Sequence, residues 1–252
     1  METMQYKMLV QTFLDLGEAM LSAGAEVSRA EETLDRLSRA YGAVGTDVFV
    51  ITSSIVVTFS FPDGTVITES RRLRRGTDYD FEKLSAFNAL SRACAICPLS
   101  REELKERIRT IAEKRPSPVK LYVGSALAAG AFCVFFGGSV WDGLLSALFG
   151  LLVCLLQLHL SPLCPNRAFF LFASAFLCGC GICGLGRLLP LATDMIIIGD
   201  IMLLVPGIAI TTAARDMVVG DTISGATRLL ECLLGAATLA AGFILSILIL
   251  GR

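Results

Sequence analysis

Histidine is nearly absent from this chain, and charge is nearly absent from its second half. His159 is the only histidine, and residues 119–252 contain six Lys or Arg and six Asp or Glu residues. A histidine base would have one candidate, which lies in an apolar segment, and neither a GxSxG nor an HExxH motif occurs. We therefore expect no enzyme and no metal centre of the hydrolase type.

The cysteines do not form a disulfide framework. There are nine, an odd number, and most lie in apolar stretches. Cys94-x-x-Cys97 and Cys180-x-x-Cys183 have a redox or metal spacing, but no second pair lies at zinc-finger distance from the first. We expect the cysteines to be structural, because a free cysteine behaves as a small buried hydrophobe.

Several other classes lack support in the sequence. A net charge of −1 and a pI of about 5.9 give no sign of nucleic-acid binding. A GxGxxG pattern occurs within the glycine-rich stretch 179–186, but no βαβ unit surrounds it, so we expect no nucleotide and no other cofactor. The first residues are amphipathic rather than a basic tip followed by an apolar run, so no signal peptide is predicted.

What the sequence has in abundance is apolar residues, and they are unevenly distributed. The chain is 54% apolar with a mean hydropathy of +0.67. Residues 1–118 nevertheless hold 16 of the 22 Lys and Arg residues and 17 of the 23 Asp and Glu residues. This split predicts a cytoplasmic α+β domain at 1–118 and a transmembrane helical domain at 119–252.

The apolar half contains segments long enough to cross a bilayer, which takes about 20 residues. Basic residues flank the ends that would face the cytoplasm, so we expect the N-terminus inside and the C-terminus outside. The five predicted spans are Val119–Gly137, Leu144–Leu160, Ala168–Leu189, Met195–Ala214 and Leu229–Leu250.

The charged half shows the patterns of a small α+β domain. Helical periodicity covers Leu9–Tyr41, with Gly24 bending or splitting the helix. β-Branched residues fill Val48–Phe59, and Thr65–Leu73 returns as a second strand of a hairpin after a Pro-Asp-Gly turn. Helices are expected at Phe81–Ala95 and, after a capping box at Ser100, to about Lys114.

The fourth span carries an acid and a helix breaker. Pro206 cannot donate a backbone hydrogen bond, and Gly207 adds freedom, so backbone groups should be released near mid-membrane. Transporters use such interruptions to hold polar solutes. Asp200 lies about six residues before the break. It is either an acid that reaches water at a helix end or a buried carboxyl that carries a coupling proton or binds a substrate ammonium.

Polar residues continue past the break. Thr211 and Thr212 either bond back to the helix backbone or contact substrate. Beyond them lies a group that is either a polar loop with a positive-inside anchor or the inner mouth of a pathway: Arg215, Asp216, Asp221, Ser224 and Arg228.

Two stretches of the chain resemble signatures of the threonine/serine exporter family. The first is Gly24-Ala25-Glu26-Val27-Ser28-Arg29-Ala30-Glu31-Glu32-Thr33, with Gly24, Glu26, Arg29 and Glu31 as its motif residues. The second runs from Leu204-Val205-Pro206-Gly207 through Arg215-Asp216 and Gly220-Asp221 to Ser224 and Arg228. Val27 stands where many relatives have threonine.

The resemblance implies the larger subunit of the family's split form, with a soluble domain and five spans. It implies a small all-membrane partner subunit, and therefore a hetero-oligomer, in the inner membrane of a bacterial cell. The implied function is proton-driven export of threonine and serine, with succinate or another dicarboxylate as the alternative substrate. A further alternative is a membrane-anchored receptor or enzyme whose N-terminal domain is the active part.

Overall fold

The structure is a computed structural model that describes residues 2–73 and 79–251. Its internal contacts divide the chain into two compact units. The first comprises Met1–Arg115 and Ile208–Leu229, and the second Pro116–Gly207 and Leu230–Arg252. Our sequence-based division at residue 118 did not place residues 208–229 with the N-terminal residues.

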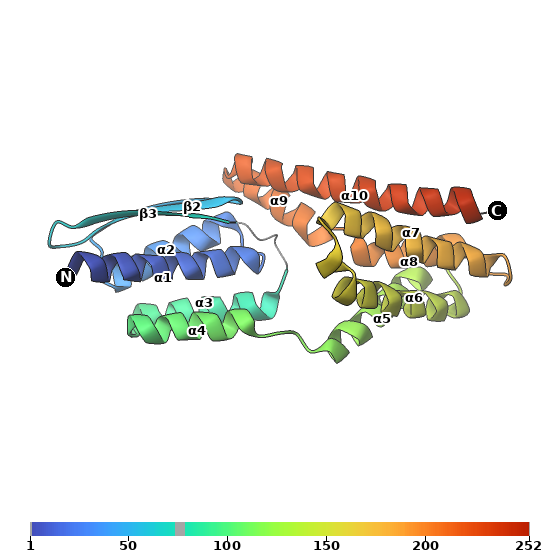
Figure 1. Ribbon diagram of the computed structural model, residues 1–252, viewed down its shortest axis with the longest axis horizontal. Helices are drawn as coiled ribbons and strands as arrows, with labels where there is room; N and C mark the ends of the chain where they lie inside the picture. Colours follow the sequence, from blue (N-terminus) through green and yellow to red (C-terminus); the bar gives the residue numbers. More distant parts are fainter. Residues whose placement is uncertain (1, 74–78, 252) are drawn as a thin grey trace. The chain divides into compact units, whose positions relative to one another are not determined.

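The N-terminal part of the first unit is built in layers (Figure 1). Two helices, α1 and α2, lie between a small antiparallel sheet and a second helix pair, α3 and α4. The bounds are α1 Glu2–Ser22, α2 Val27–Ala40, β1 Gly45–Ile51, β2 Ser54–Ser60, β3 Val66–Arg72, α3 Phe81–Ile96 and α4 Arg101–Glu113.

The long helix predicted around Gly24 is split there, as expected. Gly24 has a φ of +93°, a conformation that favours glycine. A Cβ atom at this position would lie 2.6 Å from the ring of Tyr79, so a side chain is excluded on steric grounds as well. The following residue pair, Ala25 and Glu26, leads directly into α2.

The sheet has three strands, so the predicted single strand Val48–Phe59 was wrong. A turn at Thr52–Ser53 divides that stretch, and Ile51 pairs with Ser54 across it. β-Branched residues favour strands on both sides of the turn, and no Gly or Pro marks it. The result is a β1-β2-β3 meander in which β2 is the central strand.

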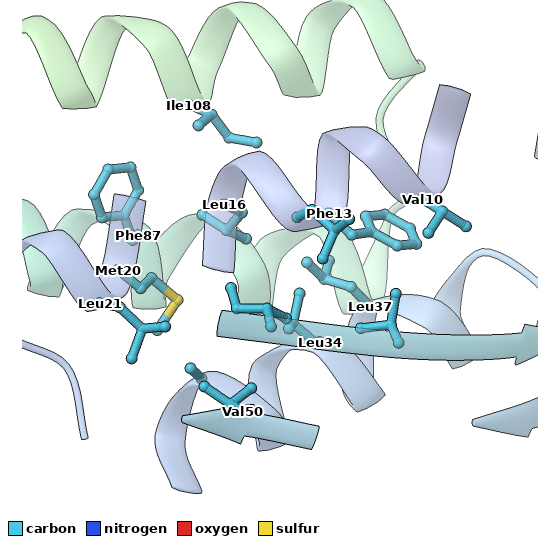
Figure 2. Close-up of a cluster of buried hydrophobic side chains, with 14 of the residues drawn as sticks. Val10, Phe13, Leu16, Met20, Leu21, Leu34, Leu37, Val50, Phe87 and Ile108 are labelled. Carbon is cyan, nitrogen blue, oxygen red and sulfur yellow. The ribbon is translucent and has the colours of Figure 1, made fainter. Parts of the chain in front are cut away.

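The core of this region follows the predicted helical stripe. Figure 2 shows its side chains meeting from both helix pairs and the sheet. The members are completely or almost completely buried, which at about 1.5–3 kcal/mol for each large side chain supplies the main stabilisation. They include Phe13, Leu16, Met20, Leu34, Leu37, Val50, Phe87 and Ile108.

The rest of the described chain is helical, as predicted for the apolar half. Four helices are long and apolar enough to cross a membrane, and α8 and α9 pass the same test as one bent pair, which gives four or five candidate spans. The bounds are α5 Pro118–Phe135, α6 Val140–His159, α7 Arg167–Gly186, α8 Thr193–Leu204, α9 Gly207–Val219 and α10 Thr222–Leu250.

The fourth predicted span is interrupted where the sequence places the breaker. Val205 leaves helical geometry with φ −65° and ψ 129°, and the amide of Gly207 donates to the carbonyl of Val205 at 2.8 Å. The chain bends by 50° at this break. The prediction of a discontinuous helix at Pro206 is therefore confirmed.

The helix that contains the fifth predicted span is longer than that span. We placed its start at Leu229, whereas α10 begins at Thr222. For the polar residues from Arg215 to Arg228 we left open a polar loop or the inner mouth of a pathway. Only residues 220–221 lie outside helix, where Gly220, at φ +110°, turns the chain between α9 and α10.

Close helix packing in the second unit depends on small residues. A Cβ atom on Gly150 of α6 would lie 2.7 Å from the carbonyl oxygen of Ser125 on α5. Between α7 and α10, a Cβ atom on Gly179 would lie 2.0 Å from the hydroxyl of Ser246. Small residues at such crossings let helix backbones approach each other in lipid.

We expect Gly179→Ala to destabilise the α7–α10 contact by about 1–3 kcal/mol, because the added methyl group overlaps the Ser246 side chain. Gly184→Ala on the same helix is the matched control, since nothing lies within 4 Å of its Cβ position. The measurement is the thermal unfolding midpoint of the two purified variants in detergent. Equal midpoints for both variants would contradict the packing argument.

Candidate functional site

The first candidate centre lies around Asp200 in the second unit. The Asp200 side chain is completely buried, and its Oδ1 atom accepts a hydrogen bond from the Ser146 hydroxyl at 3.1 Å. The same hydroxyl lies 3.0 Å from the carbonyl oxygen of Ala129. The Oδ2 atom of Asp200 has no hydrogen-bond partner among the described residues. Of our two interpretations of Asp200, the structure matches the buried carboxyl.

Local sequence explains how three helices meet at this carboxyl. Gly199 has no side chain, and a Cβ atom there would lie 2.5 Å from the Ser146 hydroxyl and 2.7 Å from the Ala129 carbonyl oxygen. The glycine therefore lets α8 approach α5 and α6 closely enough for the next residue to reach Ser146. Cys133, which interacts electrostatically with Asp200, belongs to the apolar core cluster of this unit, together with Ile182 and Ile196.

Ser146 is a residue that our sequence analysis missed. A single serine in an apolar span carries no distinctive signal, because serine there usually bonds to its own helix backbone. The available hint was the spacing of Gly143, Ser146 and Gly150, which places three small residues on one face of α6.

Asp142, by contrast, has a structural role at the start of α6. Its Oδ2 atom accepts hydrogen bonds from the amide and the hydroxyl of Ser139 at 2.9 and 2.6 Å, and Ser139 accepts from the Asp142 amide, which completes a capping box. Its Oδ1 atom accepts from the amide of Ala192 at 3.1 Å. This acid therefore fixes the segment that leads into α8.

The second candidate centre is an ion-pair cluster in the first unit, on the hairpin formed by α9 and the start of α10. Gly220 turns the chain, and the amide of Asp221 donates to the carbonyl of Asp216 at 2.8 Å. Gly225 brings α10 against α9, since a Cβ atom on it would lie 2.7 Å from the carbonyl oxygen of Ala213. Ser224, beside this contact, is buried.

A loose, buried ion pair lies inside this hairpin. Arg228 Nη1 is 3.6 Å from Asp216 Oδ2, and the two side chains are only 7% and 2% exposed. Neither of these two atoms has a hydrogen-bond partner among the described residues. A buried ionic group usually needs hydrogen bonds as well as an opposite charge, so both ends retain unused bonding capacity.

The first family-like motif meets the second one at Arg215. Its Nη1 atom donates to Glu26 Oε1 at 2.6 Å, although the two residues are 189 positions apart in sequence. Glu26 is the N-cap residue of α2, and its carboxylate makes no side-chain cap to that helix. Arg29, the third residue of the motif, is exposed.

Glu31 completes the cluster from α2. Its Oε1 atom accepts a hydrogen bond from the amide of Val50 at 2.9 Å. Burial raises the pKa of Glu31 above its ordinary value of 4.5, the Val50 hydrogen bond lowers it, and the negative charge of Asp221 raises it further. Asp216 also interacts electrostatically with Glu26, Asp221 and Arg215, so acids outnumber the two arginines here.

The remaining predicted site residues are placed as follows. Thr211 and Thr212 both donate to the carbonyl of Ile208, at 2.8 and 2.9 Å, which is the backbone-bonding alternative. Pro206 and Gly207 form the break between α8 and α9. The predicted inner-mouth residues therefore come together with Glu26 and Glu31 in the first unit, whereas Asp200 belongs to the second unit.

Two glycines of the glycine-rich stretch 179–186 serve packing. A Cβ atom on Gly181 would lie 2.7 Å from the ring of Phe149, and one on Gly186 would lie 2.2 Å from Thr193. Among the described residues, one groove lies between α3 and α4 and another lies along α5 and α6. Neither groove is lined by Asp200 or by the ion-pair cluster.

Comparison with known proteins gives one result. The family model described as "Putative threonine/serine exporter" matches residues 11–250 of this chain. No curated protein matches the chain, and no solved structure does. The matched region includes both candidate centres.

Glu31→Gln tests the electrostatics of the cluster. A folded-state pKa raised above 4.5 means that Glu31 contributes stability below about pH 4.5, and that this contribution is lost as pH rises through the folded-state pKa. Glutamine keeps an acceptor for the Val50 amide without the charge. We expect a higher unfolding midpoint than wild type at pH 7 and an equal one at pH 4, measured by thermal unfolding.

The matched control is Glu32→Gln, which removes a charge from an exposed neighbour on the same helix. It should leave the pH dependence of the unfolding midpoint as in wild type. A Glu31→Gln variant with the wild-type pH dependence would show that burial and Asp221 do not disfavour the ionised form of this carboxyl.

Proposed function

Because the chain belongs to the threonine/serine exporter family, we propose that it exports threonine and serine and that a proton carried by Asp200 drives this export. The buried, half-partnered carboxyl of Asp200 is the observation that carries the proposal. Four or five apolar helices make the protein a multi-pass membrane protein, as such transport requires.

The energetic argument begins with the cost of an ionised group in an apolar core. A buried charge without an opposite charge costs several kcal/mol, so loss or gain of a proton at Asp200 changes the energy of this centre strongly. Its only hydrogen-bond donor among the described residues is the Ser146 hydroxyl. A group whose charge state changes the packing energy of three helices is suited to couple a proton to a conformational change.

The substrate argument rests on the ion-pair cluster. Each arginine there already has an acidic partner, and Glu31 and Asp221 add further negative charge. Among the described residues, a dicarboxylate would find Arg215 and Arg228 already paired with acids, and the four acids of the cluster would repel it. An α-amino acid carries one charge of each sign, so its carboxylate can bind Arg228 while its ammonium group binds Asp216. The cluster therefore favours an amino acid over succinate.

The partner subunit and the orientation remain part of this proposal. We place the N-terminal unit in the cytoplasm, as the flanking basic residues indicate, and we propose a small all-membrane partner that supplies a second helical bundle. Reconstitution with and without that partner decides whether this chain transports alone.

Asp200→Asn is the direct test of coupling. We expect threonine export from proteoliposomes to lose its dependence on an imposed pH gradient, because asparagine cannot carry a proton. Asp194→Asn is the matched control, since Asp194 lies on the same helix and is exposed. Gradient-dependent export that survives in Asp200→Asn and remains equal to the control would exclude Asp200 from the mechanism.

Asp216→Asn tests the substrate class. The variant leaves Arg228 without its counter-charge, so we expect the affinity for threonine to fall at least about tenfold and competition by succinate to strengthen. The control is Glu231→Gln, since Glu231 is an exposed acid about one turn after Arg228 on α10. It should change neither the affinity for threonine nor the competition by succinate. The measurement is inhibition of labelled threonine counterflow by unlabelled serine and succinate. Succinate as the better competitor for the wild-type protein would reverse the assignment.

A further inference from the structure

The described groups around Asp200 include more hydrogen-bond acceptors than donors. Ser146 Oγ lies 3.1 Å from Asp200 Oδ1 and 3.0 Å from the Ala129 carbonyl oxygen, both within hydrogen-bonding range. A serine hydroxyl has one proton and can donate one hydrogen bond at full strength. With Asp200 ionised, the two acceptors therefore compete for a single donor.

The charge on Asp200 decides the outcome of that competition. A hydrogen bond to an ionised acceptor is roughly twice as strong as one between neutral groups, so the hydroxyl donates to the carboxylate when Asp200 is ionised. Ser146, on α6, is then bonded to α8, and the Ala129 carbonyl on α5 keeps only the acceptor role that its own helix gives it.

When a hydronium ion from solvent gives up a proton to Asp200 and becomes water, the arrangement reverses, and no covalent bond of the protein is broken. The proton forms an O–H bond at Oδ1, and this new donor points at the Ser146 oxygen, which can accept it. The Ser146 hydroxyl is thereby released from Asp200 and donates to Ala129 instead. A chain of two hydrogen bonds then runs from α8 through α6 to α5, with the same three atoms at nearly the same distances.

We propose that Ser146 is a positioning residue that switches its hydrogen bond from Asp200 to the Ala129 carbonyl when Asp200 takes up a proton. This inference rests on the proposed role of Asp200 as the proton carrier and adds how its charge reaches the helix packing. Because Gly199 holds α8 against Ala129 and Ser146, the change of partner adds a hydrogen bond between α6 and α5 to the one between α8 and α6.

Few other titratable groups face this centre. Cys133 on α5 and Cys178 on α7 interact electrostatically with Asp200. Asp142 on α6 and Asp194 at the start of α8 interact with Cys133. Asp142 is bonded within the capping box of α6, and Asp194 is exposed to solvent, so neither competes for the Ser146 hydroxyl.

The test uses the full-length protein with Ser146→Ala, Ser146→Cys and the control Ser174→Ala. Ser174 is a completely buried serine on α7 whose hydroxyl has no partner among the described residues. Removal of the Ser146 hydroxyl leaves ionised Asp200 without its donor. We expect the pH midpoint of threonine export to rise by about one unit in Ser146→Ala, less in Ser146→Cys, and not at all in Ser174→Ala.

An infrared difference spectrum between low and high pH reads the same carboxyl without transport. The band of a protonated carboxyl that disappears in Asp200→Asn should change frequency in Ser146→Ala, because the carboxyl O–H loses its acceptor. A band and a pH midpoint that both remain at wild-type values in folded Ser146→Ala would overturn the switch. If Asp200→Asn keeps gradient-driven export and wild type shows no band of a protonated Asp200, the result contradicts the proposed role of Asp200 as proton carrier, and the switch falls with it.

Discussion

A carboxyl group enclosed by apolar helices, with one hydroxyl to bond it, constrains everything around it in the second unit. Taking the group out of water is costly, so the hydrogen bond from Ser146 must be held in place. That bond exists only because Gly199 lets α8 come within reach of Ser146 and Ala129. The α5–α6 pair must in turn stay closely packed, which Gly143 and Gly150 permit, and Asp142 anchors the turn that begins α6.

The ion-pair cluster solves a different electrostatic problem in the first unit. Here opposite charges are available, but the pair formed by Asp216 and Arg228 is long, at 3.6 Å, and its facing atoms lack hydrogen bonds. A tight pair with all its bonds satisfied would have no capacity left for a ligand. The Arg215–Glu26 pair is shorter and more exposed, so it contributes less energy but holds α9 to the N-terminal motif.

The sequence predicts the elements whose cause is local, and it fails where the cause lies elsewhere in the chain. Pro206 breaks its helix through its own ring, so the interruption could be read directly. The turn at Thr52–Ser53 carries no turn residue and is imposed by pairing across three strands, so it was missed. The start of α10 was not predicted because a loop was one of two alternatives for the polar residues before Leu229, whereas Gly225 lets the first turns of α10 pack closely against α9.

In the candidate centres too, the residues with a local signal in the sequence were predicted and their partners were not. Asp200 and the arginines stand out in an apolar sequence, because charge is expensive there. Their partners do not stand out: Ser146 is one of many small residues, and Glu26 is one acid in a charged domain 189 positions from Arg215. Long-range pairing of this kind becomes visible only when the chain is folded.

The two centres differ in charge in a way that matters for energy coupling. A zwitterionic substrate has no net charge, so its passage does no electrical work. A proton that moves inward, by contrast, releases about 2.3 kcal/mol of free energy per 100 mV of membrane potential. One proton for each amino acid could therefore sustain about a fiftyfold concentration ratio per 100 mV, since about 1.4 kcal/mol corresponds to a factor of ten. Export of a dianion would be driven by the membrane potential itself, so it would not need a residue that carries a proton. The two proposed roles, a neutral substrate bound in the cluster of paired charges and a proton carried by the buried Asp200 carboxyl, are therefore consistent with each other.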